Sequence, residues 1–271
     1  MSRSTRTVLR LAERLTDRDY AILETVRVHR VLTTFHLGSL FFSGPTARNA
    51  RRRLLILHRC QLLDAFQPHS PEPGSRPMHW TLAPLGARVL AHRHGTTPED
   101  LGYRHDSAAG LAHSAKLGHI TGLAGTFAAF TLAARATPGA ALETWWGESQ
   151  CAAEWGGYVR PDAYLRWTQD GARLDAFVEY DTGSESLSRV AKKIPGYARL
   201  ADATRLPSPV LFVVPAPARE ANLAAALAPH ASPATPLHLT THALLQSPGP
   251  AAAVWRTPAS LQRSTLAGLT V

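Results

Sequence analysis

Hydrophobic positions in the first third of the chain recur mostly at helical spacing. The pattern predicts helices over 17–29, 35–42 and 46–59, short strands over 62–66 and 78–82, and a last helix over 85–92. Three helices followed by a two-stranded hairpin are typical of a winged helix-turn-helix. In that motif the third helix, here 46–59, is the recognition helix that enters the major groove.

From residue 108 onward, helical segments alternate with strand-like ones. The predicted elements are an alanine-rich helix over 108–134, strands over 141–148, 158–167 and 173–180, a helix that begins at Ser184, a strand over 209–215, a helix over 219–227 and a strand over 237–241. Asp170-Gly171 marks a turn that pairs its two neighbouring strands as a hairpin. The expected fold class is therefore α+β, an N-terminal winged helix-turn-helix followed by an α/β domain.

A polar, weakly patterned stretch separates these two parts. We expect a winged-helix domain at residues 1–95, a linker at 96–107 and an α/β domain at 108–245. Residues 246–271 are rich in Pro, Gly and Ala and form a C-terminal tail, for which Trp255 is the candidate anchor.

The net charge of +9 is concentrated in the first part of the chain. Residues 1–105 carry 16 Lys and Arg against 8 Asp and Glu, so they account for +8 of the total. Such a concentration indicates a polyanion as partner, and for a winged helix that partner is double-stranded DNA.

Arginines cluster on the expected recognition helix. They are Arg48, Arg51, Arg52 and Arg53, of which the first three share one face by their spacing. We expect these side chains, with Arg76 in the wing loop, to bind mostly DNA phosphates. The alternatives are a solvated charged face and a protein-docking module.

Composition indicates a cytoplasmic protein. Cys60 and Cys151 lack the spacing of a zinc site or a disulfide framework. The N-terminal residues lack the apolar core of a signal peptide. No uninterrupted stretch of about 18 apolar residues predicts a membrane span, and the alanine-rich helix is interrupted by Gly, Thr and Pro.

Three carboxylates lie near the ends of the two hairpin strands. Asp162 is expected in the first strand, and Glu179 and Asp181 at the end of the second. Glu179 and Asp181 are two residues apart, so they leave the same face of the strand. Converging acids bind a hard divalent cation, and we expect Mg²⁺ or Mn²⁺, with Glu148 as an additional candidate ligand. The alternative is a capping Asp162 and a solvated strand end.

Lysine is rare in this chain, which makes one adjacent pair conspicuous. The chain has 3 lysines against 26 arginines, and two of the lysines are Lys192 and Lys193 in the helix that follows the carboxylates. A lysine beside a metal site holds the attacking water or neutralises developing charge. Lys193, or Lys192, is the candidate for that role, and Tyr197 is expected to pack at the end of the helix.

Together these residues resemble the PD-(D/E)xK nuclease superfamily, whose motif here reads Pro161-Asp162, then Glu179-x-Asp181, then a helix with a lysine. A lysine usually stands two residues after the second acid, where this chain has Asp181. The resemblance implies a restriction-endonuclease-like fold and metal-dependent cleavage of DNA. Lys193 or Lys192 would then take the place of the usual lysine.

The block VEYDTGSESLSRVAKKIPGY, together with RPDA and the winged-helix pattern, resembles the replication-relaxation family of actinobacterial plasmids and integrative elements. The resemblance extends over roughly residues 15–215. It implies a role in plasmid replication, DNA relaxation or transfer, with replication or transfer proteins as partners. A homodimer would suit double-strand cutting or a palindromic site.

Two functions agree with these features. One is a metal-dependent DNA endonuclease or nickase that its winged helix directs. The other is a non-catalytic DNA-binding replication or regulatory factor whose nuclease-like domain is inactivated, and the replacement of the usual lysine by Asp181 favours it.

Overall fold

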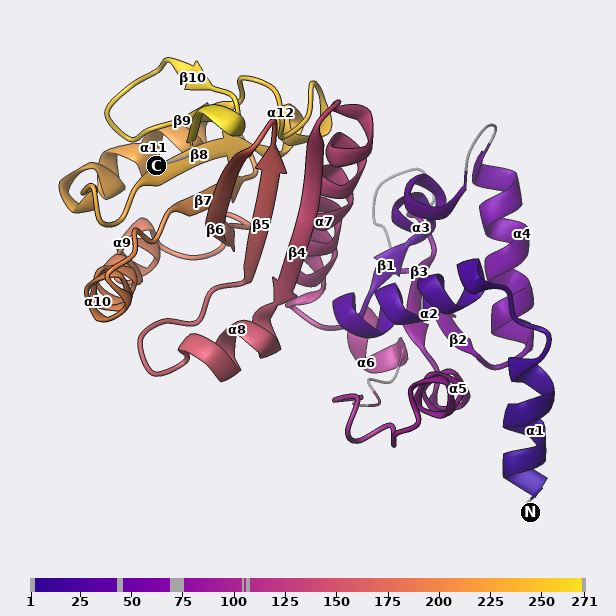
Figure 1. Ribbon diagram of the computed structural model, residues 1–271. Coiled ribbons are helices and arrows are strands. Elements are labelled where there is room, and N and C mark those ends of the chain that lie inside the picture. Colours follow the sequence, from indigo (N-terminus) through magenta and orange to yellow (C-terminus); the bar gives the residue numbers. More distant parts are fainter. Residues whose placement is uncertain (1–2, 43–45, 69–75, 104, 106–107, 270–271) are drawn as a thin grey trace. The chain divides into compact units, whose positions relative to one another are not determined.

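The computed structural model describes residues 3–42, 46–68, 76–103, 105 and 108–269. The chain is a mixed α+β protein in two units, Met1–Gly125 and Thr126–Val271, which Figure 1 shows in sequence colours. Each unit has its own sheet and its own buried apolar residues. The division falls inside a helix, after the predicted linker at 96–107.

The first unit places helices around a three-stranded antiparallel sheet with the order β1-β3-β2. Two strands form the expected hairpin. The third is Leu32–Thr33, which pairs with β3 and was not predicted. The elements are α1 (Arg3–Ala12), α2 (Asp17–His29), β1 (Leu32–Thr33), α3 (Thr34–Phe41), α4 (Thr46–Arg59), β2 (Leu63–Phe66), β3 (His79–Leu82), α5 (Pro84–His94) and α6 (Ala108–Ala112).

The helices of the first unit bury one apolar face each. The buried side chains include Ile22, Leu23 and Val26 of α2, Leu37 of α3, Leu54 and Leu57 of α4, and Trp80 of β3. Because α4 turns Leu54 and Leu57 inward, the helical period leaves its positions 48, 51 and 52 facing outward.

The first unit extends beyond the predicted domain limit at residue 95. Apolar side chains of α6 and of the following helix pack on its sheet and thereby hold this segment. The contacting residues are Val31, Phe66, Leu111, Ala112, Leu117 and Ile120.

The second unit is built on a seven-stranded mixed sheet with the order β10-β9-β8-β7-β6-β5-β4. The strands β4, β5 and β6 form an antiparallel meander, and β6, β7 and β8 run parallel. Helices make the crossovers that parallel neighbours require. The elements are α7 (Leu117–Ala136), β4 (Ala140–Gly147), α8 (Glu148–Trp155), β5 (Ala163–Gln169), β6 (Ala172–Tyr180), α9 (Leu187–Ala191), α10 (Ile194–Thr204), β7 (Val210–Val214), α11 (Pro217–Leu227), β8 (Leu237–Thr241), α12 (His242–Gln246), β9 (Trp255–Arg256) and β10 (Arg263–Ser264), with 3₁₀ turns at Ala228–His230 and Ala267–Leu269.

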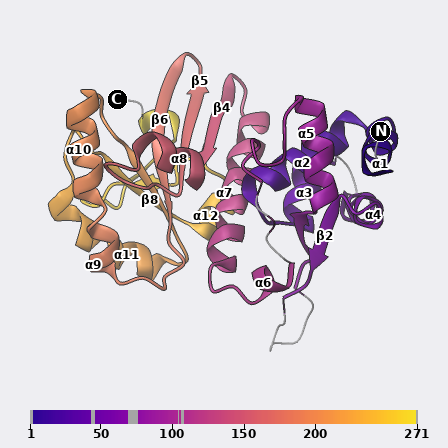
Figure 2. The ribbon, with the colours of Figure 1, turned by 90° about the horizontal axis from the view of Figure 1, so that it is seen from below.

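Both faces of the large sheet are covered, so β7 is buried at every position. Figures 1 and 2 show α9, α10 and α11 on one face and α7 on the other. On the α7 face, Phe130 is buried against Trp145, Trp167 and Trp255. By length and composition α7 would also pass as a membrane span.

The hairpin β5–β6 has the turn that its sequence predicts. Asp170 and Gly171 both have positive φ, 51° and 85°, as a two-residue type I′ turn needs. The strand β5 begins at Ala163, however, so Asp162 precedes the strand instead of lying in it. The resulting register sets Ala163 opposite Val178.

Two predicted helices are each divided in the structure. The alanine-rich segment becomes α6 and α7, separated at residues 113–116. The helix expected from Ser184 becomes α9 and α10, because Pro195 lies in the first turn of a new helix, where its missing N–H costs nothing. The helix α8, which follows β4 directly, was not predicted.

The C-terminal residues contribute strands to the sheet. Trp255 in β9 is fully buried and donates its Nε1–H to the carbonyl of Pro250 at 2.8 Å. Arg263 in β10 binds the buried carboxylate of Glu220 on α11, with Nη2 and Oε2 2.6 Å apart. These contacts tie the predicted tail, residues 246–271, to the body of the unit.

Candidate functional site

Strand pairing brings Asp162 and Glu179 to the same end of the large sheet. Gly147 at the end of β4 pairs with Ala163 at the start of β5, which pairs with Val178 near the end of β6. Asp162 precedes Ala163, and its Oδ2 accepts the backbone N–H of Tyr180 at 2.8 Å. This hydrogen bond holds the Asp162 carboxylate beside the last residues of β6.

The Glu179 carboxylate is buried, with 3% of the residue exposed. It faces α10, and each of its oxygens has a donor, one from the N-cap residue of this helix and one from its second turn. Lys193 forms an ion pair with Oε2. The Tyr197 hydroxyl donates to Oε1 at 2.5 Å. Asp162, Glu179 and Lys193 therefore form one cluster, to which Tyr197 adds a buried hydrogen bond.

The local sequence of α10 explains how both donors reach one carboxylate. Lys193 and Tyr197 are four residues apart and so leave the same face of the helix. Pro195 suits the first turn, as noted above. Gly196 allows close approach, since a Cβ there would lie 2.7 Å from the Tyr158 carbonyl oxygen. The helix thereby packs tightly on the segment that leads into Asp162.

The electrostatics of this cluster follow from burial and from a repulsive pair. Burial, and next the charge of Asp162, raise the pKa of Glu179 to about 7, although Lys193 and Tyr197 act in the opposite direction. Burial would lower the pKa of Lys193, but the two carboxylates outweigh it and raise that pKa above its usual value. Burial and the Glu179 charge raise the pKa of Tyr197 well above its ordinary range, so Tyr197 is a donor at neutral pH.

Asp181 leaves the same strand face but binds a different cation. Its Oδ2 accepts from Nε of Arg219 at 2.6 Å, and its Oδ1 accepts from the N–H of Gly183 at 2.7 Å. Arg219, in the first turn of α11, also donates to the carbonyl of Glu185 at 2.6 Å. Asp181 thus ties the loop after β6 to α11, and the expected convergence of three carboxylates is replaced by a pair plus a separate ion pair.

The donor set determines what cation the cluster fits. Among the described residues, no three His, Cys, Asp or Glu side chains are placed to hold a metal ion together. The pair Asp162 and Glu179 offers hard oxygens and a mutual repulsion that a cation would relieve. Mg²⁺ is often held by one or two carboxylates, with water and phosphate completing its shell. The pair fits such an ion provided that Lys193 withdraws from Oε2.

The other candidates lie around this cluster without joining its hydrogen bonds. Lys192 is exposed, and so is Glu148 at the start of α8. Cys151, one turn further along α8, is buried, and its pKa is raised to about 12 by burial, then by the charge of Asp162 and, more weakly, by Glu179 and Glu148. The start of α8 is therefore near the carboxylate pair.

Two participating residues were not predicted from the sequence. Tyr197 had been expected only to pack, although its spacing of four from Lys193 was a signal that both face one target. Arg219 had no assigned role, and its signal was an arginine in the first helical turn after a parallel strand. The Arg219 contact does not follow from spacing, because Arg219 is 38 residues from Asp181.

Three arginines of α4 are exposed, as their spacing predicts. They are Arg48, Arg51 and Arg52, and with Arg59 they surround the partly exposed Leu55 and Ile56. This set is called the α4 outer face below. Arg76 is also exposed, and its carbonyl accepts a hydrogen bond from the Gln67 side chain. Residues 69–75 of the predicted wing loop lie outside the described residues.

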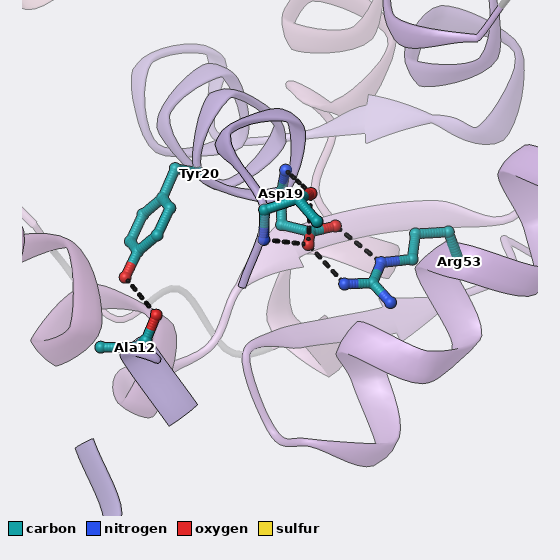
Figure 3. A network of polar contacts seen from close by, with 5 residues as sticks. Ala12, Asp19, Tyr20 and Arg53 are labelled. Atoms are coloured by element: carbon teal, nitrogen blue, oxygen red, sulfur yellow. Dashed lines mark hydrogen bonds and ion pairs between the residues drawn. The ribbon is translucent and has the colours of Figure 1, made fainter. Parts of the chain in front are cut away.

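Arg53 differs from its three neighbours because it points into the first unit. Its Nε donates to Oδ1 of Asp19 at 2.7 Å, and its Nη2 forms an ion pair with Oδ2. Asp19 is fully buried and also caps α2 through Thr16. Burial raises the pKa of Asp19, but the hydrogen bonds from Arg53 and Thr16 outweigh it and hold that pKa below its ordinary value. Figure 3 shows the Arg53 guanidinium against the Asp19 carboxylate.

These features define a class: a two-unit α+β protein with an arginine-rich helix face in one unit and a buried Asp–Glu–Lys cluster in the other. The family model described as replication-relaxation matches residues 23–211, which is more than half of the chain and includes the cluster and α4. The protein belongs to the replication-relaxation family, and membership indicates a role in plasmid or mobile-element replication. Neither the curated proteins nor the solved structures gave a match.

Proposed function

We propose that this protein is a metal-dependent DNA endonuclease or nickase of plasmid or mobile-element replication or transfer. The observation that carries the proposal is the ion pair of Lys193 with Glu179 beside Asp162. A structural ion pair would need one carboxylate. A second carboxylate that repels the first is costly unless it serves a ligand.

The arrangement of elements supports the nuclease-like fold. A helix (α7), an antiparallel meander (β4 to β6), a crossover helix (α10) and a parallel strand (β7) occur in the order of the PD-(D/E)xK superfamily, with α8 inserted after β4 and α9 before α10. Asp162 stands before the second strand of the meander and Glu179 near the end of the third. The lysine comes from the N-cap of α10 instead of from position 181.

Each residue of the cluster has a proposed task in phosphodiester hydrolysis. Asp162 and Glu179 would hold Mg²⁺ or Mn²⁺. The bound cation would lower the pKa of a coordinated water and offset phosphate charge. Lys193 would then orient the attacking water by hydrogen bonding and stabilise the charge that develops on the phosphate. Asp181 and Arg219 would fix the loop after β6.

The first unit would bind the DNA. Its order of helices and its β2–β3 hairpin fit a winged helix-turn-helix with α4 as the recognition helix. The α4 outer face offers Arg48, Arg51 and Arg52 to phosphates, whereas Arg53 would hold the helix in place. Such a protein would act in the cytoplasm, and a homodimer would suit a palindromic site.

Cleavage of supercoiled plasmid with Mg²⁺ or Mn²⁺ tests this function. We expect the wild type to nick or linearise the plasmid, and Asp162→Asn, Glu179→Gln and Lys193→Met to lose cleavage while still binding DNA. Lys192→Met is the matched control, because it removes an adjacent exposed lysine, and it should cut normally. A wild type that binds DNA but cuts with neither metal contradicts the nuclease function.

That negative result would support a second function, a non-catalytic DNA-binding replication or regulatory factor. The observation in its favour is that both oxygens of Glu179 already bind protein donors. In such a protein the Asp–Glu–Lys cluster would be a structural remnant. Replication or transfer proteins would then bind the second unit.

A further inference from the structure

The two oxygens of Glu179 have partners of different kinds. Oε1 accepts the hydroxyl of Tyr197, a buried neutral donor that stays protonated at neutral pH. Oε2 binds the ammonium of Lys193, whose side chain is 33% exposed. One oxygen is therefore bound inside the core, and the other faces a charged side chain that can reach solvent.

The inner contact comes from a fully buried side chain, whereas the outer one comes from a partly exposed side chain. The ring of Tyr197 is fully buried and packs on Phe177 with ring centroids 5.2 Å apart. The close approach of Gly196 to Tyr158 fixes the depth of α10. The lysine, by contrast, has a flexible four-carbon stem and one charged end.

We propose that Tyr197 is the positioning residue of this site and that Lys193 neutralises Oε2 of Glu179 until a divalent cation replaces the ammonium group there. Tyr197 keeps Oε1 out of reach, so exchange takes place at Oε2, where Lys193 also feels the charge of Asp162. The released Lys193 remains beside the cation, where the proposed function needs it. This inference rests on that function and adds the order in which Glu179 changes partners.

The inference requires opposite effects from two neighbouring substitutions. Tyr197→Phe keeps the buried ring but frees Oε1, so Glu179 is no longer oriented toward the cation. Loss of a hydrogen bond that orients a metal ligand lowers metal affinity by about 10- to 100-fold. Lys193→Met removes the competitor and one repelling charge, so the cation should bind more tightly, by about tenfold. If Tyr197 and Lys193 only stabilised the fold, the two substitutions would not change metal affinity in opposite directions.

The experiment measures Mn²⁺ binding to the full chain without DNA, by the electron paramagnetic resonance signal of free Mn²⁺. Tyr164→Phe is the matched control for Tyr197→Phe. It removes another hydrogen bond from a mostly buried tyrosine to a carboxylate, that of Asp175, in the same sheet but outside the site. Lys192→Met is the control for Lys193→Met. Thermal unfolding of each variant confirms that the chain is folded.

We expect Tyr197→Phe to bind Mn²⁺ more weakly than both the wild type and Tyr164→Phe, and Lys193→Met to bind it more tightly. Equal affinity of Tyr197→Phe and the wild type overturns the positioning role. Equal or weaker binding by Lys193→Met overturns the exchange. If the wild type cleaves plasmid but binds no Mn²⁺ without DNA, this inference falls and the proposed function stands. If it neither binds Mn²⁺ nor cuts, both fall.

Discussion

Replacing Arg53 by Met distinguishes two roles of arginines in α4: an ion pair inside the first unit and binding to DNA phosphates. Asp19 is fully buried, and Arg53 binds both oxygens of its carboxylate. Oδ2 accepts two further hydrogen bonds, from the backbone N–H and the hydroxyl of Thr16. The substitution leaves a buried carboxylate with its capping bonds but without its cation. It also removes an arginine from the helix to which the proposed function assigns DNA binding.

The expected loss of stability follows from burial. Removing one partner of a buried ion pair costs about 3 to 5 kcal/mol. The Arg53 side chain is 26% exposed, and Thr16 continues to bind the carboxylate, so we expect the low end of that range. Arg52→Met, at the neighbouring exposed position, should change stability by less than about 0.5 kcal/mol. It should instead reduce the slope of log affinity for DNA against log salt by about 0.9.

Urea unfolding, together with DNA binding at several salt concentrations, measures both effects. Amide hydrogen exchange of α2 and α4 would locate the loss of stability in the first unit. Asp19→Asn combined with Arg53→Met completes a double-mutant cycle, in which the two losses should not add. The reasoning is refuted if Arg53→Met leaves stability unchanged and lowers the salt slope as Arg52→Met does, since Arg53 would then act on DNA.

Three further predictions concern the carboxylate cluster and its neighbouring helix. Asp162→Asn removes a like charge, so the pKa of Glu179 should fall below about 7 in a titration followed by infrared spectroscopy; an unchanged pKa would mean that burial alone raises it. Since folding raises this pKa from 4.5, the folded chain binds a proton that the unfolded chain releases, and the free energy of unfolding should decrease as pH rises from 4.5 to about 7; Glu179→Gln should flatten that part of the profile. Gly196→Ala places a Cβ 2.7 Å from the Tyr158 carbonyl and should cost about 1 to 3 kcal/mol in urea unfolding, whereas Gly118→Ala in open space should cost nothing.

The local elements of the site could be read from the sequence because they depend on neighbours in the chain. The helix 46–59 has the expected bounds, and the Asp170-Gly171 turn has the expected positive φ values. The apolar run 209–215 forms the buried strand β7. Glu179 was expected beside a lysine of the following segment, and the structure pairs it with Lys193.

What the sequence could not indicate are the contacts that depend on tertiary packing. Arg53 and Arg52 are adjacent in the helix, but the Arg52 side chain is exposed to solvent, whereas the Arg53 side chain binds Asp19, which is 34 residues away in the sequence. Pro195 suits both the end and the start of a helix, and only packing decides between them. Asp181 was grouped with Glu179 by its strand face, yet Arg219 binds it.

The charge of the whole neighbourhood argues that the Asp181–Arg219 pair matters for the cluster. Three carboxylates (Asp162, Glu179 and Asp181) meet two cations (Lys193 and Arg219), so full ionisation leaves one negative charge. Because Arg219 is occupied by Asp181 and by the Glu185 carbonyl, that excess falls on the pair held by Lys193. A lysine at position 181 would have removed one carboxylate and added one cation, which reverses this excess to one positive charge. In this chain a proton on Glu179 can offset it near neutral pH, and a divalent cation would do so while releasing Lys193.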